Sequence, residues 1–444
     1  MPRPRIVLSA LLLSLLVSGC QAPGPVRDID WPAWWPFHTP ETAPNQTAAP
    51  TNGMAAPDAA RPDERPLLFV SWPVSPQEVE FLTTQLADFA QSQPGAPIEF
   101  VMAADYDRRV QTPAADTIPA ELPADLYLVT GFALPTLIAS NLLGPVPAQY
   151  DRLDTVAPRL APGFGVGTRA FCLPRDVHTL ALAYNPELFD RVQAPYPTAD
   201  WGWEEFAAAA AAITDQDFFI FALTLNPDLS RIAPFLLQAG GGWVDPATGR
   251  ANFDAPATRA GLDFFIEQFR EGYAVYDTTL DSIWPGEGFG RGSAGMTIEG
   301  SWLVPFLAQE FPRFVYATAE LPRGPVQRAT LAFTTCLGVN PNSPHRERAL
   351  ELAAHLTRPD IAADWRAHHG GMPVVPDEIA AWQSVDPLRA PFAAGVEYAQ
   401  VWQLPLGWES IPDEITPSIR SAIADDITVE TLAERLQTAT QNPE

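Results

Sequence analysis

Histidine, cysteine and acidic side chains at close spacing would indicate a metal site. None of the six histidines stands four residues from another with a glutamate between them, and Cys172 and Cys336 are far apart. Zinc sites that are visible in a sequence show close spacing of this kind. The adjacent His368 and His369 point two ways around a helix end, which is typical of a surface pair. The sequence therefore predicts no metal site and no cofactor.

Signatures of catalysis are also missing. The glycines of 286–292 follow no strand and precede no Walker lysine, and no Gly-x-Ser-x-Gly elbow occurs. A glycosidase needs two carboxylates that face each other, and acidic residues are abundant enough to leave that alternative open. The interpretation we favour is a protein that is not an enzyme.

Binding of a polar solute needs flat aromatic faces together with carboxylate or amide groups, and the chain has 13 tryptophans. For any single tryptophan, packing in the core is the competing explanation. Asp228 precedes a helix, so it is a candidate for binding hydroxyls and equally a helix cap. Trp243, Met372 and Trp408 are further candidates.

The elements that would position such residues alternate between strands and helices. A strand is predicted at 218–223 and a terminal helix over 415–436. Nearer the start, strands at 67–71, 98–102 and 125–130 alternate with a helix from Pro76, which a capping box of Ser75 and Glu78 opens, and a helix over 134–143. This order predicts a parallel sheet with crossover helices, whose ligands lie beyond the carboxyl ends of the strands. Trp72 follows the first strand, and Gly131 and Phe132 follow the third.

The first 66 residues resemble export and anchoring signals. Residues 1–19 combine two arginines with a short apolar stretch, which predicts a signal peptide, and Cys20 ends a lipobox-like Val-Ser-Gly-Cys. An ordinary signal peptide is the alternative. Residues 20–66 are rich in proline and alanine, which predicts a disordered tether. The net charge of −26 argues against a nucleic-acid partner.

Two segments carry a resemblance to a known family. One is 171–206, FCLPRDVHTLALAYNPELFDRVQAPYPTADWGWEEF, and the other is 289–302, FGRGSAGMTIEGSW. They resemble the extracellular solute-binding proteins of bacterial ABC transporters, in the sugar-binding branch. The resemblance implies an α/β, two-lobe periplasmic-binding-protein-like fold of type II, with a hinge and an inter-lobe ligand cleft. It implies lobe 1 at 67–178 and 329–374, and lobe 2 at 179–328 and 375–444.

The same resemblance implies roles for individual residues. Trp302 occupies a position that often supplies a stacking aromatic in sugar-binding relatives. Asp176 and His178 lie in the segment that crosses between the lobes, where relatives place polar ligand contacts, although many carry Ser or Glu in place of His178. The strands that carry Cys172 and Cys336 are neighbours in the family, so the two cysteines form either a disulfide or two buried thiols.

The predicted function is a lipid-anchored, monomeric binding protein outside the cytoplasm. It would capture a mono- or oligosaccharide between its lobes and deliver it to the permease subunits of an ABC importer. Peptides and polyols remain possible ligands. Two other classes stay open, namely a secreted carbohydrate-active enzyme and an envelope scaffold or sensor that has kept the fold without the ligand.

Overall fold

The computed structural model describes residues 65–72, 74–102, 124–245, 247–408 and 411–440. The predicted signal peptide, Cys20 and all but the last two residues of the predicted tether lie outside this range. Arg65, which we had assigned to the tether, forms a two-pronged ion pair with the buried Asp125, with N–O distances of 2.6 and 2.7 Å. The folded part therefore includes at least this residue of the predicted tether.

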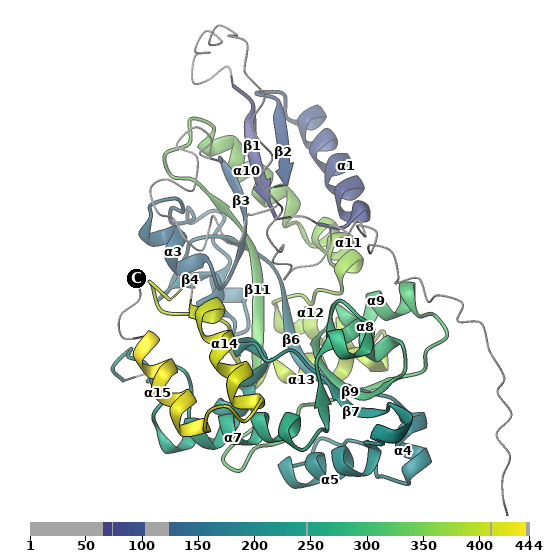
Figure 1. Cartoon of the computed structure of the whole chain (residues 1–444). Coiled ribbons are helices and arrows are strands. Elements are labelled where there is room, and N and C mark those ends of the chain that lie inside the picture. Colours follow the sequence, from purple (N-terminus) through teal and green to yellow (C-terminus); the bar gives the residue numbers. More distant parts are fainter. Residues whose placement is uncertain (1–64, 73, 103–123, 246, 409–410, 441–444) are drawn as a thin grey trace, which may run out of the picture.

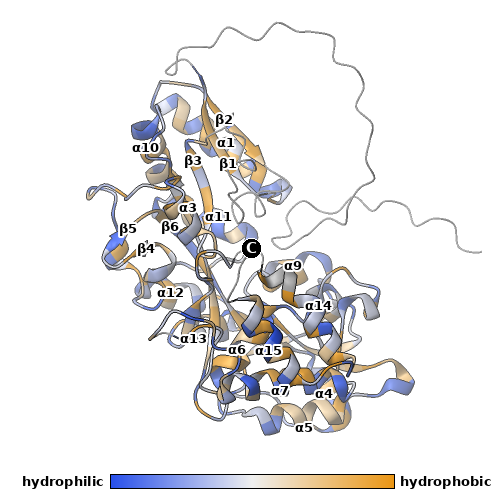
Figure 2. Ribbon diagram, turned by 60° about the vertical axis from the view of Figure 1, so that its left-hand side comes forward, coloured by the Kyte–Doolittle hydropathy of each residue, from blue (hydrophilic) through white to orange (hydrophobic). Residues whose placement is uncertain are grey.

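The first lobe is built on three parallel strands, β1 (Leu67–Ser71), β2 (Ile98–Met102) and β3 (Leu126–Thr130), in the order β2-β1-β3. Helix α1 (Pro76–Ser92) begins at a capping box in which Ser75 and Glu78 satisfy each other's backbone N–H groups. In Figure 2, β1 is coloured hydrophobic over most of its length, as expected for a strand that is buried on both faces.

Two long strands connect the lobes. Strand β6 (Leu173–Tyr184) pairs antiparallel with β11 (Thr330–Val339) over its first half and with β9 (Ala294–Gly300) over its second half. Strand β11 in turn pairs with β3, so one curled sheet runs through the molecule (Figure 1). The partner of β6 changes between Thr179 and Leu180, which places the lobe junction at the middle of this strand.

The second lobe contains the sheet order β9-β7-β8, with β7 at Phe221–Thr224 and β8 at Ala274–Val275. Its core is closed by helices from distant parts of the chain, most of which are labelled in the lower half of Figure 1. These helices are α5 (Trp203–Ile213), α6 (Leu229–Gln238), α7 (Pro256–Arg270), α14 (Ile411–Ile423) and α15 (Val429–Ala439). The remaining helices and strands are α3 (Leu134–Ala139), β4 (Gly165–Val166), β5 (Arg169–Ala170), α4 (Pro186–Val192), α8 (Pro285–Gly290), α9 (Leu303–Glu310), β10 (Ala317–Ala319), α10 (Arg346–Leu356), α11 (Pro359–His369), α12 (Pro376–Gln383), α13 (Ala390–Gly395) and β12 (Ala399–Val401).

Two elements are shorter than the sequence predicts and a third is divided, and in each case a residue other than glycine with positive φ lies at the interruption. The helix predicted over 134–143 ends at Ala139, before Asn141 at φ 55°. The strand predicted over 218–223 begins only at Phe221, after Phe219 at φ 57°. The single terminal helix predicted over 415–436 is two helices, separated at Asp425 with φ 63°. L-residues in this conformation cannot continue a helix or strand.

The segment that follows residue 375 packs partly on the first lobe. Ile379, Phe392 and Val396 pack in the same hydrophobic cluster as β3, so α12 and α13 lie against the crossing strands and first lobe. The lobe boundary at 375 stays a prediction.

Cys172 and Cys336 form a disulfide, with Cα atoms 5.7 Å apart. Among the described residues, none of the helices combines the length and the apolar character needed to span a bilayer.

Candidate functional site

The site is organised by an irregularity in β6. Asp176 pairs with Thr335 and Pro174 pairs with Cys336, which leaves Arg175 without a partner on β11. A bulge of this kind re-aims side chains next to it. Here it brings the guanidinium of Arg175 onto the carboxylate of Asp176, although adjacent residues of a regular strand point to opposite faces.

Asp176 is completely buried at this bulge. Its Oδ2 accepts a hydrogen bond from Arg175 Nε and lies 2.9 Å from His369 Nε2, and its Oδ1 has no partner. Burial alone would raise the pKa of Asp176, but Arg175 and His369 outweigh burial and hold that pKa far below its ordinary value. Asp176 is therefore an ionised carboxylate inside the protein.

His178 lies two residues further along β6 and therefore on the same face as Asp176. Its Nδ1 is 2.8 Å from Ser301 Oγ, and its ring lies 5.1 Å from Trp302 and 5.5 Å from His369. Burial lowers the pKa of His178 to about 3, so the imidazole is neutral at physiological pH. We call Arg175, Asp176, His178, Ser301, Trp302 and His369 the crossing cluster, because it joins β6 to the end of α11 and the end of β9.

A buried ion pair supports Trp302 through a hydrogen bond to its indole nitrogen. Glu299 Oε2 accepts from Arg231 Nη2 at 2.7 Å and from Trp302 Nε1 at 3.0 Å. Burial raises the pKa of Glu299, and the charge of Arg231 opposes this shift. Phe333, which pairs with His178 across the sheet, meets the Trp302 ring edge-on at 5.7 Å. Trp302 itself is 8% exposed, so its indole packs among these side chains in this structure.

A second group of aromatic rings joins the two lobes beyond β3. Phe132 stacks on Trp402 at 6.1 Å, and Trp243 meets Trp402 edge-on at 5.3 Å. Gly131 precedes Phe132, and a Cβ at this position would lie 2.2 Å from Thr334 Oγ1, so a larger residue would push the strand end away. We call Phe132, Trp243 and Trp402 the aromatic bridge.

The other predicted site residues occupy separate positions. Asp228 caps α6 by accepting a hydrogen bond from the backbone N–H of Arg231, which is the helix-cap role given above as the alternative to ligand binding. Met372 is completely buried and pairs with Val177, and Trp408 is 5% exposed and stacks on Phe253. Trp72 is half-buried after β1 and packs on the core of the first lobe. Their roles as ligand contacts stay predictions.

Several residues of the site were missed by the sequence analysis. His369, taken for a surface residue, has a side chain only 16% exposed, whereas its neighbour His368 is exposed. Arg231 and Glu299 are 68 residues apart, and no local pattern joins them. Trp402 and Phe333 had a usable signal, since each is an aromatic residue at or near a strand. Two surface hollows of about 790 and 540 Å³ lie on outer faces, and neither contains a predicted site residue.

The comparisons with known proteins agree with this architecture. The family model "Bacterial extracellular solute-binding protein" matches residues 84–390. A binding protein of Brucella abortus (strain 2308) is 23% identical over 344 residues, which are 75% of this chain and 82% of the relative. An ABC substrate-binding protein of Listeria monocytogenes, solved with cycloalternan, superposes with a TM-score of 0.73 at 18% identity, covering 85% of this chain and 98% of its own.

A third comparison is with the GacH receptor of Streptomyces glaucescens, solved without ligand and with acarbose. It has a TM-score of 0.72 at 16% identity and covers 85% of this chain and 99% of its own. The likeness confirms the predicted two-lobe fold of the periplasmic-binding-protein type. Because the family model spans most of the chain, this protein belongs to the bacterial extracellular solute-binding protein family.

Proposed function

We propose that this protein captures a carbohydrate between its two lobes and delivers it to an ABC importer from a lipid anchor on the outer side of the cytoplasmic membrane. The observation that carries the proposal is the aromatic bridge. Phe132, at the end of β3 in the first lobe, stacks on Trp402, which packs with the core of the second lobe. Ring faces shared between two lobes suit the apolar faces of sugar rings.

The neighbouring polar groups support the same ligand class. Asp176 and His178 supply a carboxylate and a neutral imidazole near the lobe junction, and both are chemically suited to sugar hydroxyls. The solved relatives support it too, since two of them were solved with the carbohydrates cycloalternan and acarbose. Binding would stabilise the closed arrangement of the lobes, which the permease then recognises.

The test is a thermal-unfolding screen of the full-length chain in detergent, across cyclic and linear oligosaccharides, monosaccharides, polyols and short peptides. A ligand that binds only the folded state raises the unfolding temperature in a saturable way. We expect one class of carbohydrate to do so. Removing a buried stacking aromatic costs about 1.5–3 kcal/mol, so Trp402→Ala should weaken that ligand about 10- to 100-fold.

Phe218→Ala is the matched control, because Phe218 is 72% exposed on the outer surface of the second lobe. Its affinity for the same carbohydrate should equal that of the parent. A peptide that shifts the transition when no carbohydrate does would refute the ligand class. Equal weakening by Trp402→Ala and Phe218→Ala would refute the site. Turnover of a glycoside during the screen would favour the enzyme alternative.

A further inference from the structure

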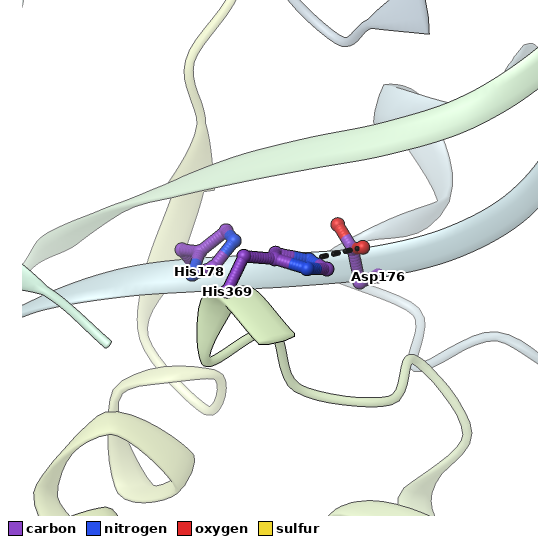
Figure 3. A group of neighbouring side chains, drawn as sticks. All are labelled: Asp176, His178 and His369. Atoms are coloured by element: carbon purple, nitrogen blue, oxygen red, sulfur yellow. Dashed lines mark hydrogen bonds and ion pairs between the residues drawn. The ribbon is translucent and has the colours of Figure 1, made fainter. Parts of the chain in front are cut away.

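The crossing cluster contains three side chains whose arrangement also fits a metal ion. Asp176 and His178 project from β6, and His369 reaches them from the last residue of α11 (Figure 3). One ligand-type atom from each of the three lies within 4.8 Å of the others. Two imidazoles and one carboxylate are a donor set that zinc and related transition metals bind with three protein ligands.

The outer contacts of the two histidines leave Nε2 as the inward-facing nitrogen. His369 Nδ1 is 3.1 Å from the carbonyl oxygen of Trp365, so the proton belongs on Nδ1 if that hydrogen bond forms. His178 Nδ1 is 2.8 Å from the hydroxyl of Ser301. Metal-binding histidines are fixed in this way, because the hydrogen bond of one ring nitrogen orients the lone pair of the other.

The carboxylate has an unmet need of its own. Asp176 Oδ1 is buried and has no hydrogen-bond partner. His369 Nε2 lies 2.9 Å from Asp176 Oδ2, so a cation shared by these two atoms would meet the need of the buried carboxylate. In this structure Arg175 Nη2 approaches His369 Nε2 at 3.3 Å and meets part of that need.

The surrounding charges limit how tightly a dication can bind. Glu78 Oε1 lies 3.6 Å from His369 Nδ1 and adds a second carboxylate to that of Asp176. Arg175 and Arg366 add two positive charges, the second through its hydrogen bond to the carbonyl of Arg175. Glu378 lies 3.8 Å from Arg366 and adds a third carboxylate, so the acidic groups exceed the guanidiniums by one and the histidine nitrogens supply the selectivity. This favours zinc-like metals over magnesium or calcium, which prefer oxygen ligands.

We propose that Asp176, His178 and His369 form a binding site for one divalent transition cation of the zinc type. Ligands at about 2.0–2.1 Å from zinc lie about 3.3 Å apart, so the imidazoles draw inward when the metal binds. The cation would tie the crossing strand to the end of α11, beside Ser301 and Trp302. The site does not depend on which solute the lobes capture.

Cobalt(II) is the appropriate probe, because a tetrahedral site containing nitrogen ligands gives it visible absorption. The full-length chain in detergent, stripped with chelator, is titrated with cobalt chloride and then with zinc chloride. We expect one equivalent of cobalt to give the absorption, zinc to displace it, and excess magnesium to leave it unchanged. His369→Ala and Asp176→Asn should each weaken binding at least tenfold.

His368→Ala is the matched control, since His368 is the adjacent residue on α11 and is exposed. It should bind cobalt like the parent. Thermal unfolding of each metal-free variant shows whether it is folded. If His369→Ala is not folded, the less drastic variant Asp176→Asn decides the test. The proposal is overturned if the parent gives no saturable absorption, if folded His369→Ala or Asp176→Asn binds like the parent, or if His368→Ala loses binding equally.

Discussion

The buried ion pair beneath Trp302 allows a quantitative test of how the site is built. Arg231 makes three polar contacts, to Glu299, to the carbonyl of Ile298 and to Ser230. Removing one partner of a buried pair leaves an uncompensated charge and costs about 3–5 kcal/mol. We therefore expect Arg231→Met to lower the free energy of unfolding by about 4 kcal/mol and Glu299→Gln to lower it by about 3 kcal/mol.

The double variant separates a coupled pair from two independent residues. In Arg231→Met/Glu299→Gln no buried charge remains, and the glutamine carbonyl still accepts from Trp302 Nε1. The remaining loss is that of the Ile298 and Ser230 contacts, at about 1 kcal/mol each. The total should be about 2–3 kcal/mol, against about 7 kcal/mol for the sum of the single variants. The coupling energy is then about 4 kcal/mol, measurable by urea unfolding of all four proteins.

The pH dependence gives a second readout of the same cycle. Burial raises the pKa of Glu299, and Arg231→Met removes the charge that opposes this shift. A carboxyl whose pKa is higher in the folded than in the unfolded state loses stability as pH rises through that range. The deficit of Arg231→Met should therefore be smaller at pH 5 than at pH 8.

Two results would refute this account. Losses that add within about 0.5 kcal/mol would mean that Arg231 and Glu299 are not energetically coupled. A Glu299→Gln variant as stable as the parent would mean that Glu299 is already neutral and that no ion pair supports Trp302.

Three further predictions concern the framework around the site. The disulfide closes a loop with a sequence separation of 164 residues, for which the chain-entropy model gives a stabilisation of about 5 kcal/mol. The variant Cys172→Ala/Cys336→Ala should lose up to this amount of unfolding free energy in urea. Two free thiols in denatured, unreduced protein would contradict the bond. Gly131→Ala should lower the free energy of unfolding by about 1–3 kcal/mol, because the added Cβ would meet Thr334 Oγ1 at 2.2 Å. A second substitution, Thr334→Ala, should restore most of this loss. A loss that Thr334→Ala leaves unchanged would assign the cost to another contact. Arg65→Ala should lower the free energy of unfolding by about 2 kcal/mol, which is less than for a fully buried pair because Arg65 is 31% exposed. An unchanged denaturation midpoint would show that Arg65 is not anchored to Asp125.

The sequence predicted the regular elements well where local rules determine them. The bounds of β1 and β2 and the capping box at Ser75 follow from apolar runs and from the spacing of Ser75 and Glu78, and the structure confirms them. The resemblance supplied the two-lobe fold, which apolar periodicity alone leaves undetermined. The positive φ angles of Phe219 and Asp425 could not be foreseen, because neither residue type marks such a position reliably.

The candidate site was only partly predictable, because its geometry depends on the bulge in β6. In a regular strand Arg175 would point away from Asp176, and the sequence gives no sign of the extra residue. The bulge brings Arg175 onto Asp176, and the end of α11 brings His369 from 193 residues away to the same carboxylate. A search for close histidine spacing therefore could not detect the group of Asp176, His178 and His369, which only the tertiary structure assembles. The aromatic bridge has the same origin, since Phe132 and Trp402 become neighbours only where the two lobes meet.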